Sequence, residues 1–161
     1  MAIKRSAGIL LYRADGDGGP EFLLVHPGGP FWAKRDAGSW SIPKGQIEDG
    51  EDPRDCALRE LGEELGAAPA LETAQLIELG SIRQRAGKVV EAWAAEADFD
   101  PAALASNTFS LEWPPRSGHE REFPEVDRAE WFGLERARGK ILPAQAEFLD
   151  RLLAHLGPPQ A

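Results

Sequence analysis

Three glutamates, Glu60, Glu63 and Glu64, are the residues whose type and spacing best suit chemistry. Side chains three or four residues apart are neighbours on a helix, and like charges there repel by about 0.2–0.5 kcal/mol per pair. Arg59 is the only cation nearby in the sequence, so the carboxylates need a further cation. Oxygen ligands without a Cys or His pattern suit Mg²⁺, and less specifically Mn²⁺ or Ca²⁺. The alternative is an acidic helix face that only contacts solvent.

A helix that begins after Asp52 and ends before Gly66 is predicted to hold these glutamates. Asp52 is a good N-cap, Pro53 suits the first helical position, and Asp55 adds negative charge to the first turn. Gly66 is placed to end the helix in a left-handed conformation, and Pro69 prevents its return. The apolar stripe expected to face the core consists of Leu58, Leu61 and Leu65.

Residues 45–67 match, at every fixed position, the signature of the Nudix hydrolases. The signature is Gly, five residues, Glu, seven residues, Arg-Glu-apolar, one residue, Glu-Glu, one residue and Gly-apolar. The matching residues are Gly45, Glu51, Arg59, Glu60, Leu61, Glu63, Glu64, Gly66 and Ala67. This resemblance implies a Mg²⁺-dependent enzyme in which water attacks a phosphorus of a nucleoside diphosphate linked to another moiety, X.

The resemblance also implies roles for residues of the signature. Glu63 and Glu64 would bind the metal, and Glu60 would be either a ligand or the general base. The backbone carbonyl of Gly45 would complete the coordination. Arg59 would act in catalysis by orienting these glutamates through salt bridges.

The remaining signature positions are expected to be structural. Glu51 would pair with the neighbouring arginine, and Gly66 would end the helix. Gly62 occupies a free position, where glycine costs a helix about 0.8–1.0 kcal/mol relative to alanine. Close packing against the sheet would explain it. Cys56, the only cysteine, fits a small helix residue and a reducing compartment.

Four residues outside the signature are candidates for the site. Nudix proteins often place a further metal-binding carboxylate before a Trp-Phe strand, and Glu125 has that position here. Lys44 precedes the signature glycine and could meet a phosphate oxygen. Arg116 could also bind phosphate or belong to a surface loop. Trp32 could stack on a base or simply pin an irregular loop.

Length and composition favour a single domain that covers residues 1–161. The net charge of −9 argues against a nucleic-acid backbone or an anionic membrane as the main partner. Local cations or metal must therefore meet an anionic substrate. No stretch approaches the ~20 apolar residues of a membrane span, and no targeting segment is evident, so a cytoplasmic location is expected.

Alternating and apolar runs predict the remaining elements. The expected strands cover residues 6–13, 21–26, 39–42, 76–83, 88–97, 107–113 and 131–132, and helices are expected from residue 134 and over 143–155. This order indicates an α/β (α+β) protein with a mixed sheet between helices. The resemblance implies the α/β/α sandwich of the Nudix proteins.

Trp40 with Pro43-Lys44-Gly45 is similar to the branch of the family that cleaves dinucleoside polyphosphates. These compounds and nucleoside triphosphates are therefore the favoured substrates, and the expected partner is a small nucleotide. A non-catalytic nucleotide sensor of the same fold is the alternative. An isoprenoid diphosphate isomerase is disfavoured because Cys56 lies inside the signature helix.

Overall fold

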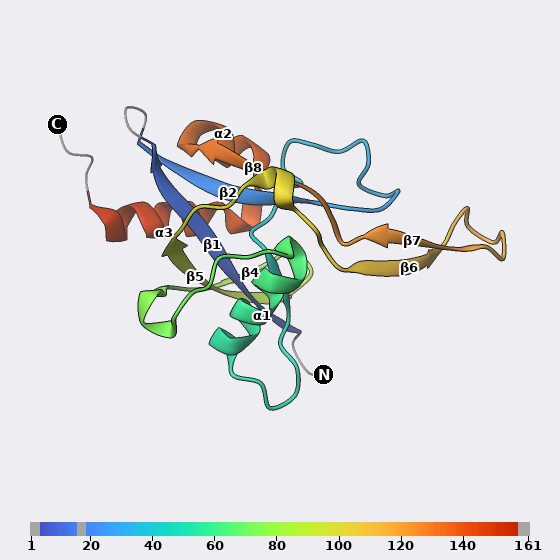
Figure 1. The fold of residues 1–161 in the computed structure, drawn as a ribbon, viewed down its shortest axis with the longest axis horizontal. Coiled ribbons are helices and arrows are strands. Elements are labelled where there is room, and N and C mark those ends of the chain that lie inside the picture. Colours follow the sequence, from blue (N-terminus) through green and yellow to red (C-terminus); the bar gives the residue numbers. More distant parts are fainter. Residues whose placement is uncertain (1–3, 16–18, 158–161) are drawn as a thin grey trace.

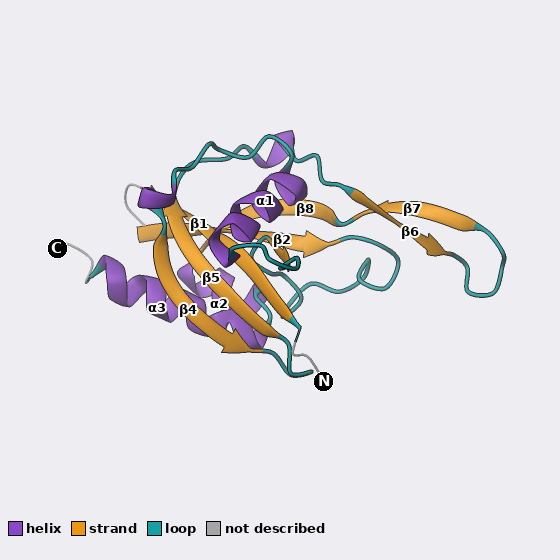
Figure 2. Cartoon of the chain, turned by 90° about the horizontal axis from the view of Figure 1, so that it is seen from below, coloured by secondary structure: helices purple, strands orange, loops and turns teal. Residues whose placement is uncertain are grey.

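A mixed β-sheet with helices on both faces forms the body of the protein (Figures 1 and 2). The structure, a computed structural model, describes residues 4–15 and 19–157. The strands of the sheet are β1 (Arg5–Asp15), β2 (Gly19–Pro27), β3 (Lys44–Gln46), β4 (Ile77–Arg83), β5 (Val89–Glu96) and β8 (Val126–Gly133). The helices are α1 (Pro53–Leu65), α2 (Leu134–Lys140) and α3 (Ala146–Leu156).

The strand order is β4-β5-β1-β2-β8, and β3 also pairs with β1. β1 runs parallel to β5 and antiparallel to β2, which makes the sheet mixed as predicted. Alternate residues of β1 belong to two cores, because successive strand side chains point to opposite faces. Ile9 and Leu11 pack with the leucines of α1, whereas Leu10 and Tyr12 pack with α3. None of the helices in the described ranges is long and apolar enough to cross a membrane.

Two of the predicted elements were wrong in their position. Residues 39–42 do not form a strand, since Trp40 and Ser41 make only isolated bridges and the strand lies at β3. The backbone of Trp40 is instead hydrogen-bonded to the end of α2, at Lys140 and Leu142. The last helix begins at Ala146, because residues 143–145 form a separate 3₁₀ turn.

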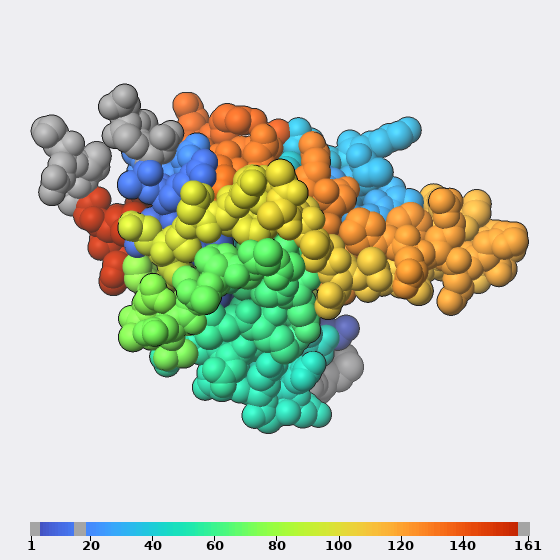
Figure 3. Space-filling view, in the orientation of Figure 1, coloured from blue at the N-terminus to red at the C-terminus, as the bar shows by residue number. Residues whose placement is uncertain are grey.

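The structure has a second, two-stranded sheet, of which only one strand was predicted. β6 (Thr108–Glu112) lies within the predicted strand, but β7 (Glu120–Pro124) has a run of charged residues that does not indicate a strand. Pairing with β6 stabilises it there. The β6–β7 hairpin projects from the body as an arm, and the loop of residues 28–38 lies beside its base (Figures 1 and 3).

Asp52 caps the start of α1 as predicted, and Gly66 ends the helix with a positive φ but with ψ −88°, which is not the left-handed helical conformation that was expected. The Asp52 carboxylate accepts hydrogen bonds from the backbone of Arg54 and Asp55, at 2.9 and 3.3 Å. Gly66 has φ 82°, and a Cβ on it would lie 2.5 Å from the carbonyl oxygen of Ala105. Glycine is therefore required at position 66 by both conformation and space.

Gly62 has neither requirement, so the expectation that it packs closely against the sheet was wrong. A Cβ at this helical position would meet no atom within 4 Å. Gly62→Ala is therefore expected to raise the free energy of unfolding by about 0.8–1.0 kcal/mol, since alanine has the higher helix propensity. Urea unfolding would measure the change, with Gly66→Ala as a destabilised comparison. A Gly62→Ala protein less stable than the wild type would contradict the prediction.

Candidate active site

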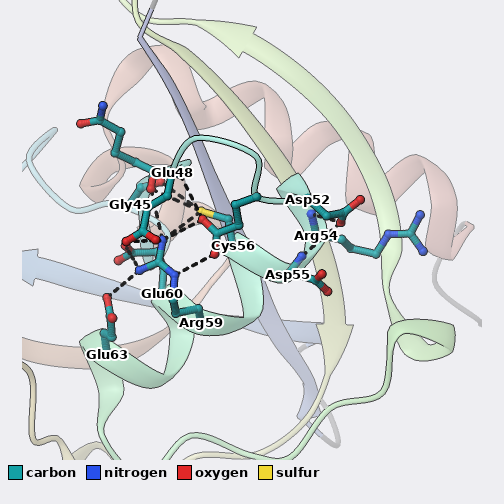
Figure 4. Close-up of polar contacts among 11 residues, drawn as sticks. Gly45, Glu48, Asp52, Arg54, Asp55, Cys56, Arg59, Glu60 and Glu63 are labelled. Carbon is teal, nitrogen blue, oxygen red and sulfur yellow. Dashed lines mark hydrogen bonds and ion pairs between the residues drawn. The ribbon is translucent and has the colours of Figure 1, made fainter.

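Glu60 and Glu63 project from α1 beside the segment that holds Gly45 (Figure 4), and Glu64 of the same helix accepts a hydrogen bond from the backbone of Lys44 in β3. Glu60 and Glu64 are buried, with 9% and 8% of their surface exposed. Only Glu63 has a substantially exposed side chain, at 37%. Two of the three carboxylates are thus held away from solvent, which excludes a merely solvated acidic face.

The backbone of β3 forms the opposite wall of this cluster. The Lys44 amide donates to Glu64 Oε2 at 2.8 Å. Gly45 lies so close to Glu60 that a Cβ would come within 2.0 Å of the carboxyl carbon. The space needed by Glu60 therefore requires glycine at position 45, the first fixed residue of the signature.

Arg59 binds the carboxylates from the other side, as expected from the sequence. Its guanidinium donates to Glu51 at 2.8 and 3.0 Å. It also donates to Glu60 at 3.0 Å and to Glu63 at 3.1 Å. The hydrogen bonds from Arg59 lower the pKa of Glu51 to about 2. One guanidinium thus donates hydrogen bonds to three glutamates of the signature and lies 3.8 Å from a fourth carboxylate, that of Glu48.

Glu64 makes no ion pair with this arginine, and the positive charge that favours its ionised form is that of Lys44. Burial raises the pKa of Glu64 to about 8, despite the hydrogen bond from Lys44. Burial, and then the charge of Glu63, raise the pKa of Glu60 and of Glu125. A low dielectric disfavours a charged carboxylate unless a cation compensates it. The cluster therefore has more negative charge than its own cations neutralise.

The donor set fits a hard divalent cation. All its side-chain ligands are carboxylate oxygens, which Mg²⁺ and Mn²⁺ prefer. Within residues 4–15 and 19–157, however, no three His, Cys, Asp or Glu side chains already converge as a complete metal cage. Arg59 binds one oxygen of Glu60 and one of Glu63, which leaves the second oxygen of each carboxylate available to a metal ion.

Glu125 is joined to this cluster through the backbone. It lies between β7 and β8, where its amide donates to the carbonyl oxygen of Asn107 at 2.8 Å. The amide of Asn107 donates in turn to the carbonyl oxygen of Glu63 at 2.9 Å. The Glu125 carbonyl also accepts from Gly28 at 2.9 Å. These bonds place the segment that carries Glu125 beside the C-terminal half of α1.

Asn107 and its neighbour Ser106 were missed by the sequence analysis. The Ser106 hydroxyl lies 3.0 Å from the carbonyl oxygen and 3.2 Å from the amide of Val126, the residue after Glu125. Ala105 also donates from its backbone to the end of α1. These contacts use mainly backbone atoms, so no residue pattern in the sequence could have indicated them.

The side chains of the three predicted substrate-binding residues are not bonded to the glutamates in the part of the chain that the structure describes. Lys44 is paired with Gly8, so its side chain leaves β3 on the face opposite α1. Burial, and then the charge of Lys88, lower the pKa of Lys44. Trp32 lies in the loop of residues 28–38, and Arg116 is exposed at the far end of the hairpin arm. Within the described chain, none of the three side chains makes a hydrogen bond or ion pair to Glu60, Glu63 or Glu64.

Cys56 is a buried helix residue, as expected. Its sulfur lies 3.7 Å from the Gly45 carbonyl oxygen and 3.5 Å from that of Gln46. Burial raises the pKa of the Cys56 thiol to about 12. Since the thiolate is the reactive form, this thiol is unsuited to nucleophilic chemistry at neutral pH.

The raised pKa of Glu64 predicts how stability depends on pH. Between its ordinary value of 4.5 and about 8, folded Glu64 keeps its proton while the unfolded chain has lost it. The free energy of unfolding should therefore fall as pH rises through this range, by up to about 1.4 kcal/mol per unit of pKa shift. Glu64→Gln removes this contribution, so the metal-free variant should lose less stability than the wild type between about pH 5 and 8.

Urea unfolding in EDTA at several pH values would measure the difference between the two proteins. Mg²⁺ added at pH 8 should stabilise the wild type more than Glu64→Gln, because a ligand that binds only the folded state stabilises it. Parallel curves for the two metal-free proteins would show that Glu64 does not titrate in this way.

Comparison with known proteins identifies one family and similar proteins within it. The NUDIX domain model matches residues 2–152. An RNA pyrophosphohydrolase of Rhizobium meliloti (strain 1021) is 30% identical over 127 residues, which cover 71% of each chain. An RNA pyrophosphohydrolase of Aeromonas hydrophila is 28% identical over 156 residues, which cover 89% of this chain and 87% of the relative.

A solved structure shows the same architecture. The Ap4A hydrolase of C. elegans, crystallised as a binary complex, aligns with a TM-score of 0.63 and 25% identity. The alignment covers 94% of this chain and 97% of that enzyme. Together with the complete signature and the mixed sheet, these matches show that the chain belongs to the Nudix family and is a Nudix pyrophosphohydrolase.

Proposed function

We propose that this protein uses Mg²⁺ to hydrolyse a pyrophosphate linkage in a nucleoside diphosphate linked to X. The observation that carries the proposal is the pair of buried carboxylates, Glu60 and Glu64, packed against the backbone of β3. Their charge exceeds what Arg59 compensates. A site built in this way favours divalent cation binding over simple solvation.

The metal would be held by Glu60, Glu63 and Glu64, with the Gly45 carbonyl and Glu125 as further ligands. When bound, Mg²⁺ neutralises phosphate oxygens, orients the phosphates and makes water more acidic. Mn²⁺ has similar ligand preferences and would be a substitute.

The protein's own groups would orient the reactants and move a proton. A carboxylate not fully engaged by metal accepts the proton of the attacking water, typically a 10²–10⁴-fold contribution. Glu60 is our candidate for that base, since burial raises the pKa of its carboxyl above the ordinary value. Arg59 positions Glu60 and Glu63 by its ion pairs, which are 3.0 and 3.1 Å long.

The favoured substrates are nucleoside triphosphates and dinucleoside polyphosphates. Relatives named RNA pyrophosphohydrolase and Ap4A hydrolase support a nucleotide with a pyrophosphate linkage. The natural partner would be such a nucleotide, and the buried thiol of Cys56 accords with a cytoplasmic location.

A substrate panel with Mg²⁺ in ¹⁸O-labelled water would test the proposal. The panel should contain nucleoside triphosphates, dinucleoside polyphosphates, sugar nucleotides and 5′-triphosphorylated RNA. Product masses would identify both the substrate and the phosphorus that water attacks. Tight nucleotide binding without any product on long incubation would instead support the alternative, a non-catalytic sensor.

A further inference from the structure

The β6–β7 hairpin has two chemically different faces. Residues that pair directly across an antiparallel ladder point to the same face, and alternate pairs share it. The register Phe109↔Phe123 and Leu111↔Arg121 therefore puts these four side chains on one face. Trp113 extends the row, because its amide donates to the carbonyl oxygen of His119 at 2.9 Å. This set of six residues is called the aromatic face below.

The other face of the hairpin is polar and acidic. It consists of Thr108, Ser110, Glu112, Glu120 and Glu122, all of them exposed. Glu112 lies directly opposite Glu120, a like-charged pair that keeps this face negative. Arg121, the one cation of the two strands, is therefore on the opposite face from the carboxylates of the strands, and Arg116 lies in the hairpin turn.

The loop of residues 28–38 packs against the aromatic face and adds Phe31 to it. Phe31 is 64% exposed, and its ring meets that of Trp113 edge to face, with centroids 5.5 Å apart. Gly29 lies against the Phe109 ring, where a Cβ would come within 2.9 Å. The same loop contributes two cations, Lys34 and Arg35. The exposed Phe31 and the half-buried Trp113 thus form an aromatic pair, and the loop that carries Phe31 also carries two cations.

The aromatic face leads back to the candidate active site. Continuing the ladder by one pair brings Asn107 opposite Glu125, and the hydrogen bond between them confirms this register. Glu125 therefore lies at the inner end of the aromatic face, and burial and then the charge of Glu63 raise the pKa of its carboxyl. From Glu125 the row runs outward past Phe123 to Trp113, about 20 Å at the rise of a β-strand.

We propose that the aromatic face and Phe31 bind the bases of a single-stranded nucleic acid whose 5′ end reaches the glutamates. Bases stack on aromatic rings and on guanidinium planes, and cations nearby meet the backbone phosphates. This inference rests on the proposed function only for what happens at the 5′ end. Binding along the arm needs neither metal nor hydrolysis.

The length of the row favours a strand over a single nucleotide. A nucleotide held by its pyrophosphate at the glutamates would cover the part of the face near Glu125 and Phe123. Trp113 and Phe31 lie at the outer end, where further nucleotides of a strand could reach them. The net charge of −9, which argues against nucleic acid for the chain as a whole, does not describe this face.

Binding can be measured without catalysis, by fluorescence anisotropy of a 3′-labelled hexanucleotide with a 5′-hydroxyl, in EDTA. Saturable binding by the wild-type protein is expected. Trp113→Ala and Phe31→Ala should each weaken it about tenfold, since each removes a stacking ring. Trp113→Phe should restore most of the affinity. Arg121→Ser should reduce the slope of log affinity against log salt by about one, if Arg121 meets a phosphate.

Matched control variants come from the polar face of the same hairpin. Ser110→Ala and Glu112→Gln should leave the affinity unchanged or, by removing negative charge, slightly higher. Circular dichroism and thermal melting would show that all variants fold, as expected for exposed positions on an arm. RNA and DNA versions of the hexamer would distinguish the two kinds of strand.

Three results would overturn the inference: no binding of either hexamer, binding unaffected by Trp113→Ala and Phe31→Ala, or equal binding of inorganic polyphosphate, which has no bases. A dinucleoside polyphosphate that binds with the same dependence on Trp113, while the hexamers do not, would also overturn it. Failure of the proposed function is separate, because a protein can bind the hexamer in EDTA and yet hydrolyse no pyrophosphate.

Discussion

Glu60→Gln is expected to lower kcat for the best substrate of the panel by about 10²–10⁴-fold. The substitution keeps the shape of the side chain but removes its negative charge and its ability to accept a proton. Glu60 is buried against Gly45 and held by Arg59, so the carboxylate is fixed in position and its loss cannot be offset by rotation of the same side chain. Steady-state kinetics with saturating Mg²⁺ would measure the loss.

The same variant separates the two possible roles of Glu60. If Glu60 is the general base, calorimetry should show nearly unchanged Mn²⁺ affinity and kcat should lose its dependence on the corresponding ionisation. If it is a metal ligand, Mn²⁺ affinity should fall together with kcat. Glu78→Gln is a suitable control, since Glu78 is exposed on β4. A Glu60→Gln enzyme with wild-type kcat would refute both roles.

The site could be predicted from the sequence to the extent that it is local. Asp52, Gly66 and the leucine stripe define α1, and helical spacing then brings Glu60, Glu63 and Glu64 to one side. The contacts of Arg59 follow from the same short-range geometry. Within one helix, spacing in the sequence translates directly into distance.

Burial and long-range pairing were beyond such reasoning. The helical spacing gives no sign that Glu64 would lie under the Lys44 amide, because that contact depends on how β3 pairs with β1. The same pairing directs the Lys44 side chain away from the glutamates. A shift of one residue in register would reverse this, and a short strand beside a proline gives little periodicity from which to read it.

The hairpin arm shows a second feature that the sequence could not predict. β7 was not expected, since Glu120, Arg121 and Glu122 are poor strand residues by propensity. In the structure they alternate between the two faces of a ladder with β6, and strand propensity is overridden by pairing. Charge averaged over the whole chain likewise conceals the separation of cations and carboxylates between the two faces of this arm.

Gly45→Ala is expected to inactivate the enzyme as severely as a change to a glutamate, although alanine brings no new chemical group. Its methyl carbon would lie 2.0 Å from the carboxyl carbon of Glu60 and 2.1–2.2 Å from both oxygens. The carboxylate must therefore move by an ångström or more, and misplacement on that scale can cost about 10²-fold in rate. Kinetics and Mn²⁺ calorimetry would record losses in both kcat and metal affinity.

A double-mutant cycle would show whether this loss acts through Glu60. If the alanine harms the enzyme only by displacing that carboxylate, Gly45→Ala should cost little further activity in the Glu60→Gln background. Gly62→Ala, which adds a methyl group to the same helix without a clash, is the matched control and should keep wild-type kcat. Additive losses for Gly45→Ala and Glu60→Gln would instead show that Gly45 acts independently. The Gly45 carbonyl oxygen would then be the group to examine. Gly45 would bind the metal directly, and the space that it leaves for the Glu60 carboxylate would not be its main role.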